Sequence, residues 1–240
     1  MSATVVQYPV APRAPCTRLA DSVAAAKKRS GAHVRAPSER LALVLDMDEC
    51  LVHSQFQNDV AQYRQSERRP AHVAPYSDSF EIVLDDGERA RVNKRPGLDR
   101  FLEEAAKHYD VYVFTAGLEA YGKPILDALD PKGTLFAGRF FRASCRPHKG
   151  MFLKDLRVVH GRDLSRVVLV DNNPVSFLLQ PSNGIPVPSF YDDEADRTLE
   201  SLSKVLTSLQ DVDDVRPRLH QLFRLADLLA DHQRVILGQQ

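Results

Sequence analysis

Residues 41–54 read LALVLDMDECLVHS, and this stretch decides the fold. Residues 41–45 form a run of five apolar residues, which is typical of a strand buried on both faces of a parallel sheet. Asp46 and Asp48 follow directly. Side chains two apart along a strand point to the same side, so the two carboxylates would repel each other. A bound cation at the end of the strand would offset that repulsion.

Two further apolar runs end in the same way. Residues 110–117 read DVYVFTAG, and residues 166–173 read RVVLVDNN. Their polar ends supply Thr115, Asp171 and Asn172. Ligands of open α/β sheets bind beyond the carboxyl ends of the strands, so the three runs together predict one site at that edge.

Amphipathic stretches separate these runs. Residues 95–109, 119–131 and 195–209 each place apolar side chains at helical spacing. Strands that alternate with helices predict an α/β fold built on a doubly wound, three-layer, largely parallel sheet.

Two stretches predict small antiparallel insertions into this sheet. Residues 80–93 read as a hairpin with an Asp-Gly turn, and residues 138–156 read as strands that turn near residues 148–150. The polar span 57–78 has little periodicity and predicts a long surface loop.

The composition is that of an ordinary globular protein. The chain has 240 residues, of which 43% are hydrophobic and 27% are charged. The 32 basic and 32 acidic side chains cancel, which argues against a nucleic-acid binder that works by bulk positive charge. Three cysteines are too few for a disulfide framework, and no apolar run approaches the length of a membrane span. We therefore expect an intracellular protein without a membrane span or a direct nucleic-acid partner.

The composition also divides the chain into two parts. Residues 1–38 are rich in Ala, Pro, Ser and Arg and hold a single acid, Asp21. This bias predicts a disordered basic segment, with a mitochondrial presequence or a nuclear address at the KKR of residues 27–29 as alternatives. Residues 39–240 are expected to form one α/β domain with a C-terminal helix.

The motif DMDEC, residues 46–50, has the form D-x-D-x-[T/V] with Cys50 in the last position. Together with FTAG, a downstream lysine and DNNP, it resembles the haloacid dehalogenase superfamily. The resemblance narrows to the phosphatases of the RNA polymerase II C-terminal domain and their small relatives. Six blocks similar to that branch run in its order from residue 41 to residue 217: DMDECLVHSQF, KRPGLDRFL, VFTAGLEAY, FFRASCRPHKGMFLKDL, VVLVDNNP and VDDVRP.

The resemblance implies a haloacid dehalogenase-like, Rossmann-like fold without a large cap domain. It also implies that Asp46 is a nucleophile that forms an aspartyl-phosphate. Asp48 is expected to be the general acid for the leaving alkoxide and then the base for water. Mg²⁺ is the implied cofactor. Its expected ligands are the Asp46 carboxylate, the Asp48 carbonyl, Asn172, and Asp171 either directly or through one water.

The resemblance assigns substrate contacts as well. Thr115 is expected to donate a hydrogen bond to the phosphoryl group, and Lys154 to compensate its developing charge. Arg142 matches an arginine that contacts the substrate phosphate. The family's apolar recognition pocket corresponds to Phe56, Leu118 and Tyr121. These three side chains could equally belong to the core.

We therefore expect a Mg²⁺-dependent phosphatase that acts on phosphoserine and phosphothreonine in proteins, because an uncapped cleft suits a phosphorylated protein segment. One alternative is a non-catalytic peptide-binding subunit of the mitochondrial inner-membrane translocase type, which tends to lose catalytic residues. Another is a small-molecule phosphatase, which normally has a cap. The nucleus or cytoplasm is favoured over the mitochondrion, and the oligomeric state is left open. Cys50 departs from the motif, but it is a small side chain and a buried thiol is usually inert.

Overall fold

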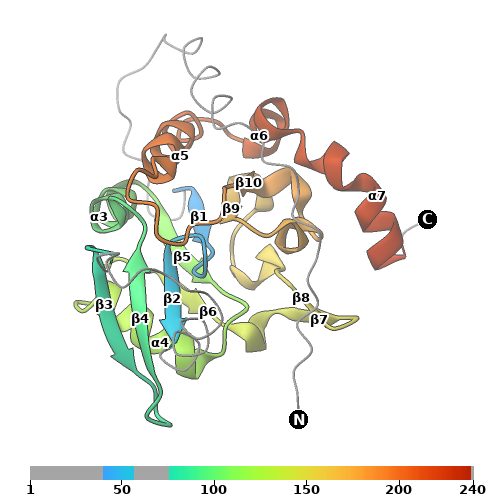
Figure 1. The fold of residues 1–240 in the computed structure, drawn as a ribbon. Helices are drawn as coiled ribbons and strands as arrows, with labels where there is room; N and C mark the ends of the chain where they lie inside the picture. The colour runs from blue at the N-terminus through green and yellow to red at the C-terminus, as the bar shows by residue number, and fades with distance from the viewer. Residues whose placement is uncertain (1–39, 57–75, 239–240) are drawn as a thin grey trace.

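The computed structural model describes residues 40–56 and 76–238 of the chain. Their centre is a five-stranded sheet of order β10-β9-β1-β5-β6 (Figure 1). Every neighbouring pair in this sheet is parallel. The strands are β1 (Ala42–Leu45), β5 (Asp110–Phe114), β6 (Gly138–Phe140), β9 (Val167–Asp171) and β10 (Gly184–Pro186). The three predicted apolar strands are therefore confirmed as β1, β5 and β9.

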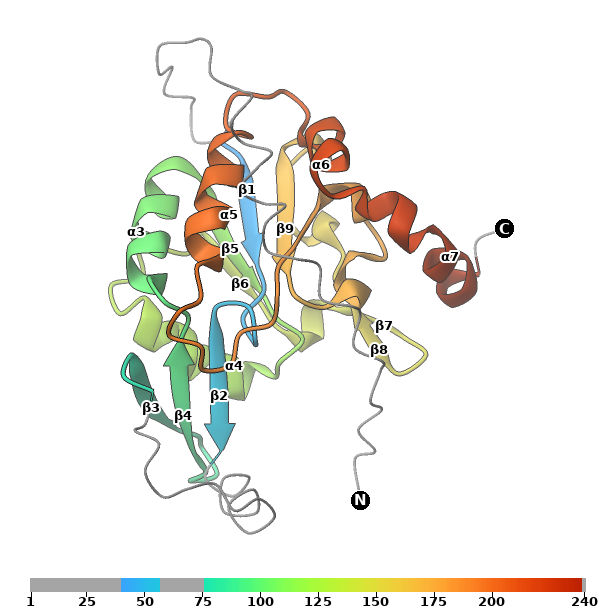
Figure 2. The same ribbon diagram turned by 45° about the horizontal axis from the view of Figure 1, so that its top comes forward.

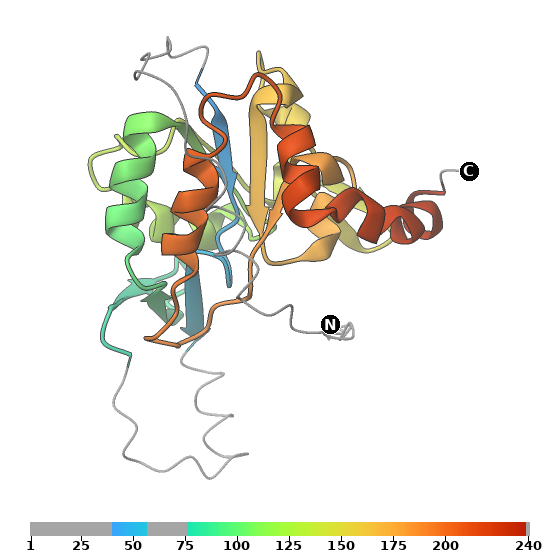
Figure 3. The same cartoon turned by 90° about the horizontal axis from the view of Figure 1, so that it is seen from above.

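The three helices predicted from periodicity are present as α3, α4 and α5, and two further helices, α6 and α7, end the described chain. The helices are α3 (Leu98–His108), α4 (Glu119–Leu129), α5 (Thr198–Thr207), α6 (Val215–Phe223) and α7 (Leu225–Leu237). Figures 2 and 3 show α3 and α5 side by side, while α6 and α7 lie toward the other edge and α7 reaches outward. None of the helices in the described part of the chain has both the length and the apolar content for a membrane crossing.

The side chains of β1 explain why its sequence is continuously apolar. Leu43 and Leu45 pack into a core cluster that includes residues of α3, α4, α5 and α6. Ala42 and Val44 face a second cluster, formed with α7 and with short 3-10 turns that follow β8 and β9. Both faces of the central strand are thus buried, and the predicted three-layer α/β architecture is confirmed.

The predicted antiparallel insertions are confirmed for residues 80–93 and for the second part of the stretch 138–156. The prediction is wrong for residues 138–140, which form β6 and pair parallel to β5 at the edge of the large sheet. The sheet of order β2-β4-β3 consists of β2 (Val52–Phe56), β3 (Ser79–Val83) and β4 (Arg89–Lys94). A hairpin of β7 (Arg146–His148) and β8 (Met151–Leu153) turns through Lys149 and Gly150, at φ 47° and 80°. These left-handed angles are typical of tight hairpin turns. Residues 1–38 and residues 57–75 of the predicted loop lie outside the described residues.

The fully buried Arg95, just before α3, ties the loop after β1 to the segment that leads into α5. Its guanidinium donates to both carboxylate oxygens of Asp196, at 3.0 and 2.7 Å, and to the Thr198 hydroxyl at 2.7 Å. It also donates to the carbonyl oxygens of Cys50 and Pro188, each at 2.9 Å. Arg95 therefore anchors the loop that follows β1, at Cys50, to the segment that leads into α5.

Replacing Arg95 by methionine should remove these bonds and leave the Asp196 carboxylate without its cation. Breaking a buried ion pair from one side costs about 3–5 kcal/mol. We expect the free energy of unfolding, measured by urea titration, to fall by that amount. Lys107→Ala is the matched control, because its exposed pair with Glu104 should contribute less than about 1 kcal/mol. Similar losses in the two variants would contradict the anchoring role.

Candidate active site

The carboxyl ends of three neighbouring strands meet at one edge of the large sheet. β1 lies between β9 and β5, with Leu45 opposite both Val170 and Val113. The backbone N–H of Asp46 donates to the Val170 carbonyl at 2.9 Å, which brings Asp46 beside the end of β9. Thr115 follows β5 on the other side. The topology therefore gathers the polar strand ends into one place.

Lys154, which follows β8, reaches between the two strand-end aspartates. Its ammonium donates to Asp46 Oδ1 and, at 2.6 Å, to Asp171 Oδ2. The three residues are only 2%, 7% and 0% exposed, respectively. Burial lowers the pKa of Lys154, but attraction by Asp171 and Asp46 outweighs burial and raises it overall. Lys154 is therefore a permanent ammonium that supplies one positive charge for two buried carboxylates.

Asp46 shows the effect of this imbalance. Burial and repulsion by Asp171 raise the pKa of Asp46 well above its usual value, against the opposing effect of Lys154. A second positive charge beside Asp46 would favour its ionised form.

Polar atoms of Asn172 and Asp48 lie on the other side of Asp46. The Asn172 amide atom that faces the site lies 3.1 Å from Asp46 Oδ2 and 3.2 Å from the Asp48 carbonyl oxygen. The other amide atom of Asn172 lies 3.1 Å from the Ser189 hydroxyl. An amide nitrogen facing the site would donate to both oxygens, whereas an amide oxygen there gives three oxygens facing one another. Ligands at 2.0–2.1 Å around a six-coordinate ion lie about 2.9 Å apart, so this spacing fits a small divalent cation.

Asp171 is placed differently from the other expected ligands. Its Oδ2 accepts from Lys154, and its Oδ1 accepts from the backbone N–H of Asn173 at 2.7 Å. Its direct ligation of a metal stays a prediction. Among the described residues, no group of three or more His, Cys, Asp or Glu side chains is arranged to hold a metal. The candidate site instead combines carboxylate, amide and carbonyl oxygens.

Asp48 is held at both carboxylate oxygens. The Tyr121 hydroxyl donates to Oδ1 at 2.5 Å, and the Thr115 hydroxyl donates to Oδ2 at 3.1 Å. Burial raises the pKa of Asp48, and the Tyr121 bond only partly opposes this effect. A raised pKa suits a general acid, since more of the group is protonated near neutral pH. Thr115 also accepts from the Gly117 N–H at 2.8 Å, and its expected contact with a phosphoryl group stays a prediction.

The predicted substrate residues come from different segments: Phe56 ends β2, Leu118 and Tyr121 lie at the start of α4, and Arg142 follows β6. Arg142 donates from Nε to the Ala116 carbonyl at 2.6 Å, and its guanidinium lies 4.8 Å from the centre of the Phe152 ring. The Phe56 and Tyr121 rings lie against each other, 5.7 Å apart at their centres. Leu118, directly before α4, is 55% exposed. Phe56 and Tyr121 also pack against the main core cluster, so their assignment to an apolar subsite stays a prediction.

The sequence did not predict three contacts of the site: Tyr121 with Asp48, Ser54 with Tyr121, and Arg142 with Phe152. The Tyr121 hydroxyl was expected only as part of an apolar pocket, and Ser54, 2.7 Å from it, had no assigned role. Phe152 beneath Arg142 was not singled out either. No local pattern reveals such pairs, because Ser54 and Tyr121 are 67 residues apart in the sequence.

Cys50 behaves as the small apolar residue that its motif position requires. It is 1% exposed. Burial, followed by repulsion from Asp46 and Asp171, raises the pKa of its thiol well above the usual value. The protonated thiol is a poor nucleophile, which agrees with an inert structural role.

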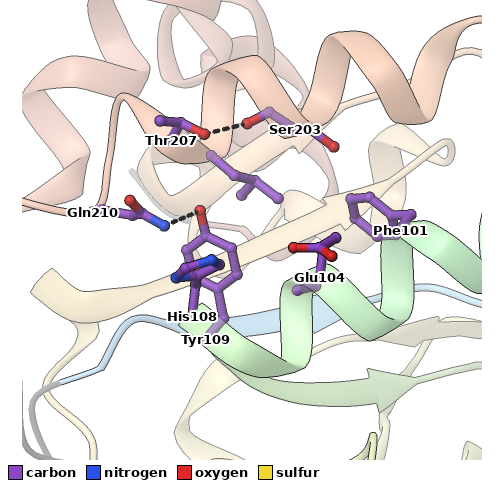
Figure 4. Close-up of a pocket in the computed structure, with 9 residues that line it drawn as sticks. Phe101, Glu104, His108, Tyr109, Ser203, Thr207 and Gln210 are labelled. Atoms are coloured by element: carbon purple, nitrogen blue, oxygen red, sulfur yellow. Dashed lines mark hydrogen bonds between the residues drawn. The ribbon is translucent and has the colours of Figure 1, made fainter. Parts of the chain in front are cut away.

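A surface hollow of about 280 Å³ lies elsewhere, between α3 and α5 (Figure 4). Two hydrogen bonds lie within its lining: Gln210 donates to the Tyr109 hydroxyl at 2.9 Å, and the Thr207 hydroxyl donates to the Ser203 carbonyl at 2.9 Å. None of the predicted site residues lines it. This hollow is therefore separate from the carboxylate cluster.

Comparison with known proteins matches the same part of the chain. The family described as NLI interacting factor-like phosphatase matches residues 41–216. A probable C-terminal domain small phosphatase of Dictyostelium discoideum is 42% identical over 176 residues, which are 72% of this chain and 52% of that protein. The human carboxy-terminal domain RNA polymerase II polypeptide A small phosphatase 1 is 38% identical over 186 residues, which are 77% of this chain and 65% of that protein. The chain thus spans about half to two thirds of these relatives.

A solved structure shows the same fold. The fission yeast RNA polymerase II CTD phosphatase Fcp1, bound to beryllium fluoride, superposes with a TM-score of 0.51 at 22% sequence identity. The superposition covers 82% of this chain and 57% of that one. At this identity the likeness concerns the fold, and it agrees with the haloacid dehalogenase-like α/β architecture. Because the family match includes every strand of the central sheet and all the residues of the carboxylate cluster, this chain belongs to the NLI interacting factor-like phosphatase family.

Proposed function

We propose that this chain is a Mg²⁺-dependent phosphatase that hydrolyses phosphoserine and phosphothreonine in protein segments through an aspartyl-phosphate. One observation carries the proposal: Lys154 holds Asp46 from one side, while the Asn172 amide and the Asp48 carbonyl oxygen lie beside it on the other. The family membership supports a phosphatase. A buried carboxylate held this rigidly is a suitable nucleophile.

The first chemical step transfers the phosphoryl group to Asp46. We assign the attack to Oδ1, the oxygen beside Lys154, because Oδ2 faces Asn172 and the Asp48 carbonyl. A bond forms between this oxygen and phosphorus while the bond from phosphorus to the serine oxygen breaks. Asp48 gives its proton to the departing alkoxide, and Lys154 stays beside the phosphoryl oxygens.

The second step returns the enzyme to its starting state. Water attacks the phosphorus of the aspartyl-phosphate, Asp48 accepts a proton from that water, and Asp46 leaves as a carboxylate. Mg²⁺, held by Asp46, the Asp48 carbonyl and Asn172, would neutralise charge between the phosphate and the carboxylates. Arg142 is proposed to bind the remaining phosphate oxygens with its terminal nitrogens.

The proposed substrate is a phosphorylated protein segment with an apolar residue next to the phosphoresidue. The names of the relatives point to the C-terminal domain of RNA polymerase II, so a phosphopeptide from that tail is the first substrate to test. The protein itself is proposed to act in the nucleus or the cytoplasm. The contact between Phe56 and Tyr121 supports an apolar subsite. A non-catalytic peptide receptor is disfavoured because Asp46, Asp48 and Lys154 are all present.

Loss of the nucleophile should abolish turnover. Asp46→Asn keeps the shape of the side chain but removes its charge, so hydrolysis of an aryl phosphate and of a phosphoserine peptide should fall by orders of magnitude. EDTA should do the same to the unaltered protein, and added Mg²⁺ should restore the rate. Asp127→Asn, on the exposed face of α4, is the matched control and should keep full activity. Full turnover in EDTA, or in Asp46→Asn, would overturn the proposal.

Cation binding should depend on pH through Asp46. Its pKa in the metal-free fold lies above 3.8, so the metal-free fold loses stability as pH rises from the usual value through the raised one. A bound cation offsets that loss, whereas a proton on Asp46 competes with the cation. The rise in Tm caused by Mg²⁺ should therefore be larger at about pH 7.5 than at about pH 5.5. Asp127→Asn should show the same difference and Asp46→Asn should not. An equal rise at both pH values in the unaltered protein would contradict the assignment.

The apolar subsite should be visible in substrate choice. Burying a proline-sized group is worth about 1–2 kcal/mol, or about a tenfold preference in kcat/KM for a phosphopeptide that carries one. Phe56→Ala should erase that preference while the rate with a small aryl phosphate stays nearly intact. Val83→Ala, at an exposed position of β3, serves as the control. Equal losses with both substrates would show that Phe56 is a core residue.

A further inference from the structure

The Tyr121 hydroxyl lies at the centre of a hydrogen-bond chain that ends on Asp48. It is 2.5 Å from Asp48 Oδ1 and 2.7 Å from the Ser54 hydroxyl. A phenol carries one proton, and an ionised carboxylate can only accept. Tyr121 therefore donates to Asp48, and Ser54, on β2, donates to Tyr121.

This chain limits the orientations of the Asp48 carboxylate. The terminal torsion of an aspartate is broad, so an unsupported carboxylate would rotate over a wide range. Here Tyr121 holds Oδ1 while Thr115 holds Oδ2 at 3.1 Å, and the two donors together define the carboxylate plane.

Gly117 shows how closely this group is packed. A Cβ atom at this position would lie 3.1 Å from Thr115 Oγ1, 3.2 Å from the Tyr121 ring and 3.5 Å from Asp48 Oδ2. The first two distances are shorter than ordinary contacts, so the absence of a side chain lets both donors approach the carboxylate together. Thr115, Tyr121 and Asp48 are therefore packed closely together around Gly117.

We propose that Tyr121 is a positioning residue for the general acid Asp48, and that Ser54 in turn orients the Tyr121 hydroxyl. This inference rests on the proposed function. The ring of Tyr121 contacts Phe56 while its hydroxyl contacts Asp48. One side chain therefore joins the apolar subsite to the proton donor, so a substrate group packed on the ring meets an acid that is already aligned.

The test removes one oxygen atom and varies the leaving group. Tyr121→Phe keeps the ring, so KM for a phosphoserine peptide should change by less than about twofold. Its single-turnover phosphoryl-transfer rate should fall by about tenfold or more, because general acid catalysis contributes 10²–10⁴-fold and a misaligned acid retains part of it. With nitrophenyl phosphate, whose leaving group needs no proton, the loss should be less than about threefold.

Ser54 variants test the outer bond of the chain. Ser54→Ala should lose rate in the same leaving-group-dependent way but to a smaller extent, and Ser54→Thr should recover it because the hydroxyl is kept. The double variant Tyr121→Phe with Ser54→Ala should be no slower than Tyr121→Phe alone, since Ser54 acts through Tyr121. Additive losses would show that Ser54 acts independently.

If Tyr121→Phe loses the same fraction of its rate with both substrates, the hydroxyl has a structural role. If it loses no rate, Asp48 needs no support from Tyr121. Either result overturns the inference. Asp48→Asn distinguishes this failure from failure of the proposed function. If Asp48→Asn shows the leaving-group dependence and Tyr121→Phe does not, only the inference falls. If the unaltered protein hydrolyses neither substrate, or Asp48→Asn shows no dependence, the proposed function fails and the inference falls with it.

Discussion

The ammonium of Lys154, buried between Asp46 and Asp171, is the interaction on which the rest of the site depends. Three charges are removed from water here, and without the cation the two carboxylates would face each other unshielded. The arrangement still leaves an excess of negative charge, which raises the pKa of Asp46. This excess of negative charge at the end of β1 would favour a bound cation, as the proposed function requires.

The fold supplies the rigidity that this charge cluster needs. β1 is hydrogen-bonded on both sides, to β5 and β9, and its side chains are buried on both faces. The backbone beyond it is fastened by Arg95, whose guanidinium reaches the Cys50 carbonyl and the segment before α5. Lys154 enters from a hairpin that belongs to neither sheet. The site therefore joins segments that are far apart in the chain, and each is held by backbone pairing or by a buried polar contact.

Local pattern was sufficient for most of the architecture. The apolar runs that became β1, β5 and β9 are periodicity signals, and the two hairpins are marked by glycine-containing turns. The likeness to the phosphatase branch predicted the side chains that now surround Asp46. It assigned Tyr121 to an apolar pocket only, because a family motif records which residue is present and not which atom of that residue is used. In the structure, both the ring and the hydroxyl of Tyr121 have partners.

The sequence by itself determined the α/β class, the polar ends of three parallel strands and the carboxylates at the end of β1, because these follow from side-chain spacing along a regular backbone. Tertiary structure alone decided that Lys154 bridges Asp46 and Asp171, that Ser54 supports Tyr121, and that Arg95 pairs with Asp196. These pairs are separated by 17 to 108 residues. A hydrogen bond between such distant positions requires side-chain directions that are set only when the sheets, hairpin and helices have packed together.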